Sequence, residues 1–196
     1  MKKHSFLSSI LALVSLLAVS VIESVKANLI TNGGFETGSL TGWTQSGNTG
    51  FTDVFGSFLG TPPHSGNFQV FFGPVGSHGF MAQNLATTPG GSYVIDFWLA
   101  SLAGPANFFS VNWDGASIFS LTDSSAFDYT EFTFELSAAN ASTPLQFEFV
   151  QNASFFLLDD VIVNPSGVTV PDAGSTFSLL SLASLGIAAL RCKLSC

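Results

Sequence analysis

Apolar and polar side chains alternate from Glu131 onward in Tyr129-Thr130-Glu131-Phe132-Thr133-Phe134-Glu135-Leu136-Ser137. Successive side chains of a β-strand leave opposite faces of its sheet, so this stretch predicts a strand with one buried and one wet face. The segment Pro144–Val150 follows after a short polar linker and repeats the alternation. Two neighbouring segments of this kind favour an antiparallel sheet.

The same pattern recurs along most of the chain. Gly, Pro, Asn and Asp separate the alternating segments, and Asp114-Gly115 supplies the positive φ angles that a tight hairpin turn requires. About eight short strands predict a two-layer antiparallel sandwich and exclude a helical fold. The predicted strands are Phe68–Phe72, Phe80–Leu85, Tyr93–Ala100, Asn107–Trp113, Ser117–Leu121, Tyr129–Ser137, Pro144–Val150 and Phe155–Val163.

Aromatic rings are the predicted ligand contacts, because the faces of sugar rings stack on flat side chains. Trp98, opposite Phe97 on its strand, and Trp113, beside a turn, are predicted as exposed platforms, whereas Trp43 is predicted to pack in the core. For any single ring, the core is the competing interpretation. Three pairs of consecutive Phe residues put one ring on each face of a strand. They predict an outer sheet face that is partly covered by loops or that is apolar and prone to association. They are Phe71-Phe72, Phe108-Phe109 and Phe155-Phe156.

Charge is distributed very unevenly. All five Lys and Arg residues lie outside the stretch Asn28–Val170, which contains eleven carboxylates and therefore a net charge of about −11. Such a surface repels nucleic acid and anionic lipid, so neither is a predicted partner. Carboxylates in this number, without cationic side chains, must lie far apart, accept hydrogen bonds or be neutralised by a bound cation. Oxygen-rich acidic sites select Ca²⁺. Both cysteines, Cys192 and Cys196, lie near the C-terminus, which leaves this stretch without a disulfide.

The N-terminal segment has the features of an export signal. Lys2 and Lys3 precede the apolar run Phe6–Ile22, and Val25-Lys26-Ala27 offers small residues to signal peptidase. We therefore expect residues 1–27 to be a signal peptide with an apolar helix. An uncleaved anchor helix is the alternative.

The C-terminal segment, residues 167–196, contains the apolar run Phe177–Leu190 and then Arg191 and Lys193. As a helix the run covers roughly 21 Å, less than the roughly 30 Å hydrocarbon core of a bilayer. It is therefore predicted as a hydrophobic sorting helix that holds the protein in the membrane before processing. The basic residues favour a cytoplasmic C-terminus. A buried core helix is the alternative.

The box that precedes this run is Val170-Pro171-Asp172-Ala173-Gly174-Ser175. It resembles the VPDSG variant of the PEP-CTERM sorting signals, with Ala173 in place of the first Ser of the motif. The resemblance covers about the last thirty residues. It implies recognition by an exosortase, a membrane cysteine transpeptidase, and display at the cell surface.

The middle of the chain, residues 28–166, has a second resemblance. Asn32-Gly33-Gly34-Phe35-Glu36-Thr37-Gly38 with Gly42-Trp43, the segment Gln83–Tyr93 and the closing Leu158–Val163 are similar to landmarks of carbohydrate-binding-module and galactose-binding-like jelly rolls. The resemblance implies a jelly-roll β-sandwich and a structural Ca²⁺ held by Glu36 and Asp160. The alternative is that Glu36 caps a turn and Asp160 accepts backbone hydrogen bonds.

Catalytic motifs are missing from the sequence. Asp159 and Asp160 are adjacent, so they are predicted on opposite faces of a strand. Glu131 and Glu135 resemble the acidic strand of some jelly-roll glycosidases, yet they lie roughly 13 Å apart, beyond the roughly 5–9.5 Å that glycoside hydrolysis uses. They predict a solvated strand face. His64 and His78 are predicted loop residues, and no nucleophile elbow or phosphate loop is present.

These patterns predict an exported, non-catalytic cell-surface or exopolysaccharide-matrix protein in which the sandwich binds polysaccharide. A purely structural surface protein is the main rival. A secreted glycan-active hydrolase is the least favoured reading.

Overall fold

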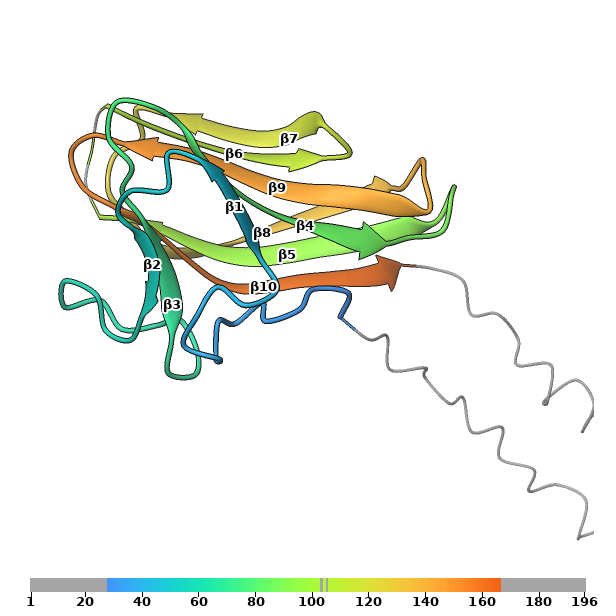
Figure 1. Cartoon of the computed structure of the whole chain (residues 1–196), viewed down its shortest axis with the longest axis horizontal. Coiled ribbons are helices and arrows are strands. Elements are labelled where there is room, and N and C mark those ends of the chain that lie inside the picture. Colours follow the sequence, from blue (N-terminus) through green and yellow to red (C-terminus); the bar gives the residue numbers. More distant parts are fainter. Residues whose placement is uncertain (1–27, 103, 105, 167–196) are drawn as a thin grey trace, which may run out of the picture.

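The computed structural model describes residues 28–102, 104 and 106–166, which form ten β-strands in two facing sheets (Figure 1). The predicted signal peptide, the sorting segment and the Val170–Ser175 box lie outside these residues. Within the described part of the chain, no helix has the length and apolar character needed to cross a membrane.

Each sheet has five antiparallel strands. The first sheet has the order β1 (Thr44–Gly47), β4 (Gly79–Ala86), β9 (Ser142–Gln151), β6 (Asn107–Trp113), β7 (Ala116–Thr122). The second sheet has the order β2 (Thr52–Phe55), β3 (Gln69–Phe72), β10 (Phe156–Ser166), β5 (Ser92–Ser101), β8 (Phe127–Ser137). All eight predicted strands are present, and the predicted two-layer sandwich is confirmed. The four-residue strands β1 and β2 were not predicted.

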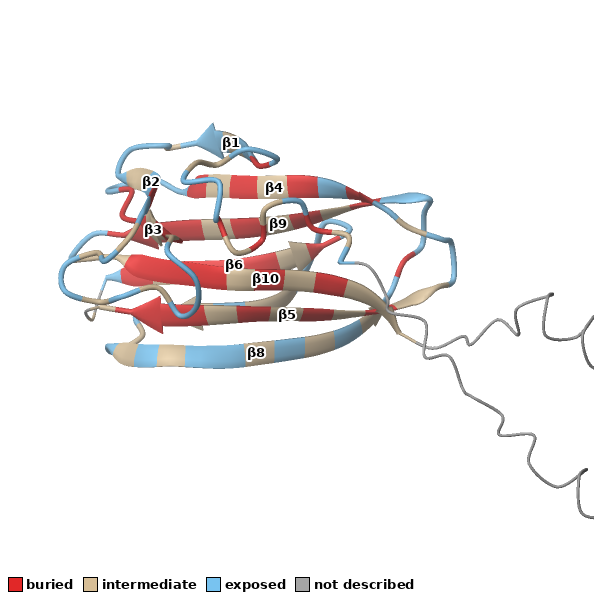
Figure 2. Cartoon of the chain, turned by 90° about the horizontal axis from the view of Figure 1, so that it is seen from below, coloured by how far each residue is buried: buried red, intermediate tan, exposed pale blue. Residues whose placement is uncertain are grey.

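The core lies between the two sheets. Buried and half-buried residues alternate along β5 and β9, as the sequence pattern predicts (Figure 2). Trp43 is only 8% exposed and stacks on Phe35, which confirms its predicted core position. Phe72, Phe109 and Phe156, the second members of the three pairs, are fully buried.

The segment before β1 runs along β10. Leu29 N donates to Val163 O over 2.8 Å, and Val161 N donates to Gly33 O over 3.0 Å. A Cβ atom at Gly33 would lie 2.0 Å from Val161 O, so only glycine lets the two backbones approach this closely. This contact brings the Gly34–Glu36 region to the middle of β10.

Candidate ligand-binding site

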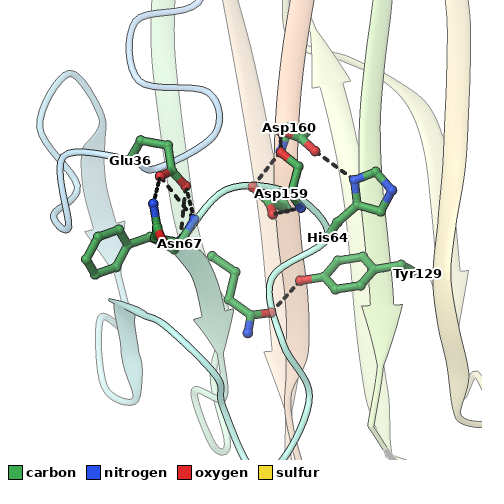
Figure 3. A network of polar contacts seen from close by, with 9 residues as sticks. Glu36, His64, Asn67, Tyr129, Asp159 and Asp160 are labelled. Atoms are coloured by element: carbon green, nitrogen blue, oxygen red, sulfur yellow. Dashed lines mark hydrogen bonds and ion pairs between the residues drawn. The ribbon is translucent and has the colours of Figure 1, made fainter.

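A loop formed by residues 56–68, named here the 56–68 loop, lies against the outer face of the second sheet. Gln69, which is fully buried, holds it from below: Nε2 donates to Gly56 O over 2.7 Å and to Thr61 O over 2.9 Å. The Gln69 Oε1 atom accepts a hydrogen bond from the Tyr129 hydroxyl (Figure 3). The loop is therefore fastened to both β3 and β8.

Aromatic packing adds to this attachment. Phe58 of the loop stacks on Phe71, with ring centroids 4.1 Å apart and an interplanar angle of 8°. Phe155 meets Phe58 edge to face, with centroids 4.8 Å apart. The outward rings of two Phe pairs are thus covered by the loop, which confirms the prediction of a covered outer face.

A β-bulge in β10 places Asp159 and Asp160 beside the same loop. The register against β5 shifts between Asp159 and Ile162, and Asp160 has a φ of 49°. Asp159 Oδ2 accepts from Ser65 N over 3.2 Å, and Asp160 Oδ1 accepts from Ser65 Oγ over 2.8 Å. The prediction that these carboxylates leave opposite faces is wrong, because a bulge breaks the two-residue period of a strand.

Burial governs the electrostatics of this carboxylate pair. Asp159 is fully buried, and this burial raises its pKa to about 7 despite the hydrogen bond from Ser65 N. The charge of Asp160 raises the Asp159 pKa further. Burial also raises the pKa of Tyr129, so its hydroxyl stays a hydrogen-bond donor.

His64 links the loop to the aromatic side chains of β5 and β8. Its Nδ1 atom lies 2.7 Å from Asp160 Oδ2. Its ring stacks on Trp98, with centroids 3.7 Å apart and an interplanar angle of 13°, and meets Tyr129 edge to face at 5.6 Å. Trp98 is half-buried, and His64 covers one of its faces, so the interpretation of Trp98 as an open platform is wrong.

Trp113 does not lie on the surface either. It is 4% exposed, its Nε1 donates to Ser137 O over 3.0 Å, and its ring packs against Tyr93. Its prediction as an exposed platform is wrong. The alternation along β6 carries the missed signal, because Phe109, Val111 and Trp113 share one face and that face is the core.

Glu36 acts as a cap for the end of the 56–68 loop. Its carboxylate accepts hydrogen bonds from Asn67 N at 2.9 and 3.1 Å, from Phe68 N at 3.0 Å and from Asn67 Nδ2 at 3.2 Å (Figure 3). The hydrogen bond from Asn67 N is the main cause that lowers the Glu36 pKa. The contacts of Glu36 are therefore those of the turn-cap alternative. In the part of the chain that the structure describes, the partners of the Asp160 carboxylate are the His64 and Ser65 side chains.

Glu36 and Asp160 also lie near each other. A Cβ atom at Gly34 would be 3.4 Å from Asp160 Oδ1 and 3.8 Å from Glu36 Cγ. Both carboxylates are hard oxygen donors of the kind that Ca²⁺ takes, but both already accept hydrogen bonds. Among the described residues, no three His, Cys, Asp or Glu side chains form a group suited to a metal ion. Two carboxylates alone fall short of a complete Ca²⁺ shell.

A pocket of about 540 Å³ opens between the 56–68 loop and the ends of β5 and β8. We name it the loop pocket. It combines rings, hydroxyl groups and one carboxylate, Asp128. Its lining residues are Thr61, Pro62, Pro63, His64, Ala100, Ser101, Leu102, Ala126, Phe127, Asp128 and Tyr129. Sequence reasoning missed this pocket, because its walls come from three segments that only the fold brings together.

A second polar cluster lies on the outer face of the first sheet. His78 Nδ1 lies 2.7 Å from Glu148 Oε1, and Ser110 Oγ donates to Glu148 Oε2 over 3.3 Å. Ser110 thus bonds the carboxylate and not the imidazole, which is not the order of a catalytic triad. The two other acidic candidates, Glu131 and Glu135, are exposed on β8, in agreement with a solvated strand face.

Comparison with known protein families supports the interpretation of the C-terminal tail. Residues 169–194 match the VPDSG-CTERM motif, which confirms the resemblance of the tail and indicates an exported, sorted protein. No curated protein matches the chain.

The described domain is similar to solved carbohydrate-binding modules. TmCBM61, solved in complex with β-1,4-galactotriose, is 17% identical with a TM-score of 0.60; the match covers 71% of this chain and 99% of that one. The CBM22-1 xylan-binding domain of Paenibacillus barcinonensis Xyn10C is 16% identical with a TM-score of 0.51, over 74% of this chain and 100% of that one. These matches establish the predicted jelly-roll fold.

A similar fold is also found within an enzymatically active domain. The enzymatically active domain of bacteriophage CBA120 tailspike protein 4 is 14% identical with a TM-score of 0.51, and the match covers 70% of this chain but 21% of that one. Fold alone therefore does not decide between binding and hydrolysis.

Proposed function

We propose that this protein is an exported, non-catalytic cell-surface or exopolysaccharide-matrix protein that binds polysaccharide in the loop pocket. The observation that carries the proposal is the pocket itself: rings and hydroxyl groups converge on a loop that buried hydrogen bonds hold in place. The galactotriose and xylan named for two structural neighbours support a saccharide as the ligand class.

The pocket residues supply the two kinds of contact that sugars need. The rings of His64 and Tyr129, with Pro63, present apolar surface to a pyranose face. Thr61 and Asp128 offer hydrogen-bond partners to its hydroxyl groups. Trp98 supports His64 from the opposite side and acts as a positioning residue. Because the loop is fastened before the ligand arrives, little ordering entropy opposes binding.

A glycan array followed by calorimetry tests this proposal. Ala126→Trp should fill the pocket and abolish binding, because Ala126 is an exposed lining residue whose loss removes no known contact. Ala116→Trp, at the exposed hairpin end of β7, is the matched control and should bind normally. Loss of binding in Phe108→Ala, on the outer face of the first sheet, together with normal binding in Ala126→Trp would move the site to the first sheet. Absence of any array signal would favour the structural role.

Export and sorting form a separate part of the proposal. Signal peptidase is expected to remove residues 1–27, and an exosortase to process the chain near Val170–Ser175. Mass spectrometry of surface-exposed protein should therefore find no peptide beyond about Ser175. Recovery of the intact C-terminus from the cell surface would contradict processing, although not surface display.

Ca²⁺ binding at Glu36 and Asp160 stays a prediction. A resident ion would neutralise two carboxylates and join the 28–36 segment to β10. Melting of the purified protein in Ca²⁺ and in chelator tests it, with Glu36→Gln as the control. A midpoint that rises with Ca²⁺ only in the wild type would establish the site, and an unchanged midpoint would reject it.

A further inference from the structure

The loop pocket belongs to a domain with many carboxylates, and Asp128 is the one carboxylate among its lining residues. Residues 28–166 contain no Lys or Arg, so His64 is the single lining side chain that can carry a positive charge. His64 is already paired with Asp160. A carboxylate on a ligand would therefore find no free cationic partner in the pocket. An acidic sugar is the wrong ligand class for this site.

Asp128 is the lining group that is free to meet a cation. It is exposed at the start of β8, and no described residue donates a hydrogen bond to its carboxylate. The rings of Phe127 and Tyr129 line the same pocket. An ammonium group beside a carboxylate and an aromatic face gains from both, and each contribution is stronger where water is partly excluded.

The rest of the domain acts in the same direction. Eleven carboxylates without a Lys or Arg counter-charge create a negative potential over the whole surface, which raises the local concentration of cations and repels anions. Asp160, which pairs with the lining residue His64, offsets any positive charge on that imidazole. The field therefore favours a positively charged ligand before contact as well as in the bound state.

From this charge distribution we propose that the loop pocket selects a sugar residue that bears a protonated amine, with Asp128 as its counter-ion. The inference rests on the proposed polysaccharide-binding function and narrows its ligand class. A free amino sugar is favoured over a neutral sugar, and a neutral sugar over a uronic acid.

Three matched β-1,4-linked hexamers test the inference by calorimetry: glucosamine, glucose and glucuronic acid. The first two differ only by an amine in place of a hydroxyl group at C2. In 20 mM NaCl we expect the glucosamine hexamer to bind at least about five-fold more tightly than the glucose hexamer, and the glucuronic acid hexamer to bind most weakly. In 300 mM NaCl the advantage of the amine should shrink, because salt screens the charge of an open site.

Variants separate a specific contact from general attraction. Asp128→Asn should reduce the affinity for the glucosamine hexamer to about that for the glucose hexamer, because the counter-ion is lost. Asp114→Asn, which removes the same charge from an exposed turn away from the pocket lining, should leave the affinity unchanged. Ala126→Trp should abolish binding of both hexamers.

Two results would overturn the inference. One is failure of the glucosamine hexamer to bind; the other is a preference that Asp114→Asn weakens as much as Asp128→Asn does. A neutral glycan that binds in the array and is lost in Ala126→Trp would keep the proposed function while the amine preference fails. A protein that binds no glycan at all would end both.

Discussion

Asp159 is an acidic residue in a position where a charge is costly. It is fully buried beneath the 56–68 loop, and its two oxygens accept hydrogen bonds from Ser65 N and Asp160 N. Two neutral donors do not replace full hydration, so burial raises the pKa to about 7. The proton on Asp159 is therefore coupled to folding.

The sign of this coupling gives a testable pH dependence. The unfolded chain releases the Asp159 proton near pH 3.9, whereas the folded protein keeps it up to about pH 7. Between these values the folded state binds more protons, so the stabilisation is present below about pH 4 and is lost as the pH rises through 7. Each unit of the shift corresponds to about 1.4 kcal/mol.

Asp159→Asn should flatten this dependence. Asparagine cannot ionise, but it has one acceptor oxygen and leaves one of the two backbone donors unpaired, at a cost of about 1 kcal/mol at every pH. Urea unfolding from pH 4.5 to 8 should show that the variant loses less stability than the wild type. The other carboxylates are the same in both proteins, so their repulsion cancels when the two pH profiles of stability are subtracted. Parallel curves for the two proteins would mean that Asp159 does not carry the proton.

At the level of elements, one buried amide makes several of the hydrogen bonds that attach the 56–68 loop. Gln69 makes three hydrogen bonds, to Gly56 O, Thr61 O and the Tyr129 hydroxyl. Gln69→Leu has a similar volume but removes the hydrogen-bond partner of Gly56 O and of the Tyr129 hydroxyl. Thr61 O keeps its hydrogen bond from Phe58 N. We expect a loss of roughly 2–4 kcal/mol in unfolding free energy and faster hydrogen exchange in residues 56–68.

Gln45 provides the matched control for this substitution. Its Nε2 atom is buried and has no hydrogen-bond partner in the described structure. Gln45→Leu should therefore leave stability unchanged or raise it, because it removes a polar group that gained nothing from burial. Equal destabilisation by both Leu variants would show that packing, and not hydrogen bonding, holds the loop.

The alternation of residue types predicts the long strands well, because one face of each is core and the other faces outward. It does not predict β1 and β2, whose four residues each are too few for a period to appear. These two strands form through their pairing with β4 and β3. The bulge at Asp160 cannot be predicted from the sequence either. Nothing in Asp159-Asp160 indicates the left-handed φ of Asp160, which turns both carboxylates toward the loop.

For the candidate binding site, the sequence predicts only the class of residue that would contact a ligand. Aromatic residues were expected to contact the ligand, and the pocket does contain rings. However, His64 and Asp160 are 96 residues apart, and no local pattern indicates that they meet. The prediction of Trp98 as an open platform failed for the same reason. The sequence of β5 indicates the face of the sheet from which the Trp98 ring projects, but it does not indicate that His64 stacks on that ring.

For the whole molecule, self-repulsion is the dominant electrostatic term. Eleven carboxylates between residues 28 and 166 have no Lys or Arg partner, and the two ion pairs found in the described structure both depend on a protonated histidine. A fold that survives this repulsion must obtain its stability from the Phe-rich core and the two sheets. Its surface charge opposes folding throughout the neutral range.

Salt should therefore stabilise this domain, whereas it weakens a domain that depends on surface ion pairs. Raising NaCl from 10 to 100 mM shortens the screening length from roughly 30 Å to roughly 10 Å, which is less than the width of the domain. We expect the melting temperature to rise by roughly 3 °C or more at pH 7.5, measured by calorimetry. The rise should become smaller at pH 4.5, where protonation has already removed part of the charge. A melting temperature that falls with NaCl at pH 7.5 would mean that attractive pairs involving His64 and His78 outweigh the repulsion, and the account of the pocket as a uniformly negative environment would fail with it.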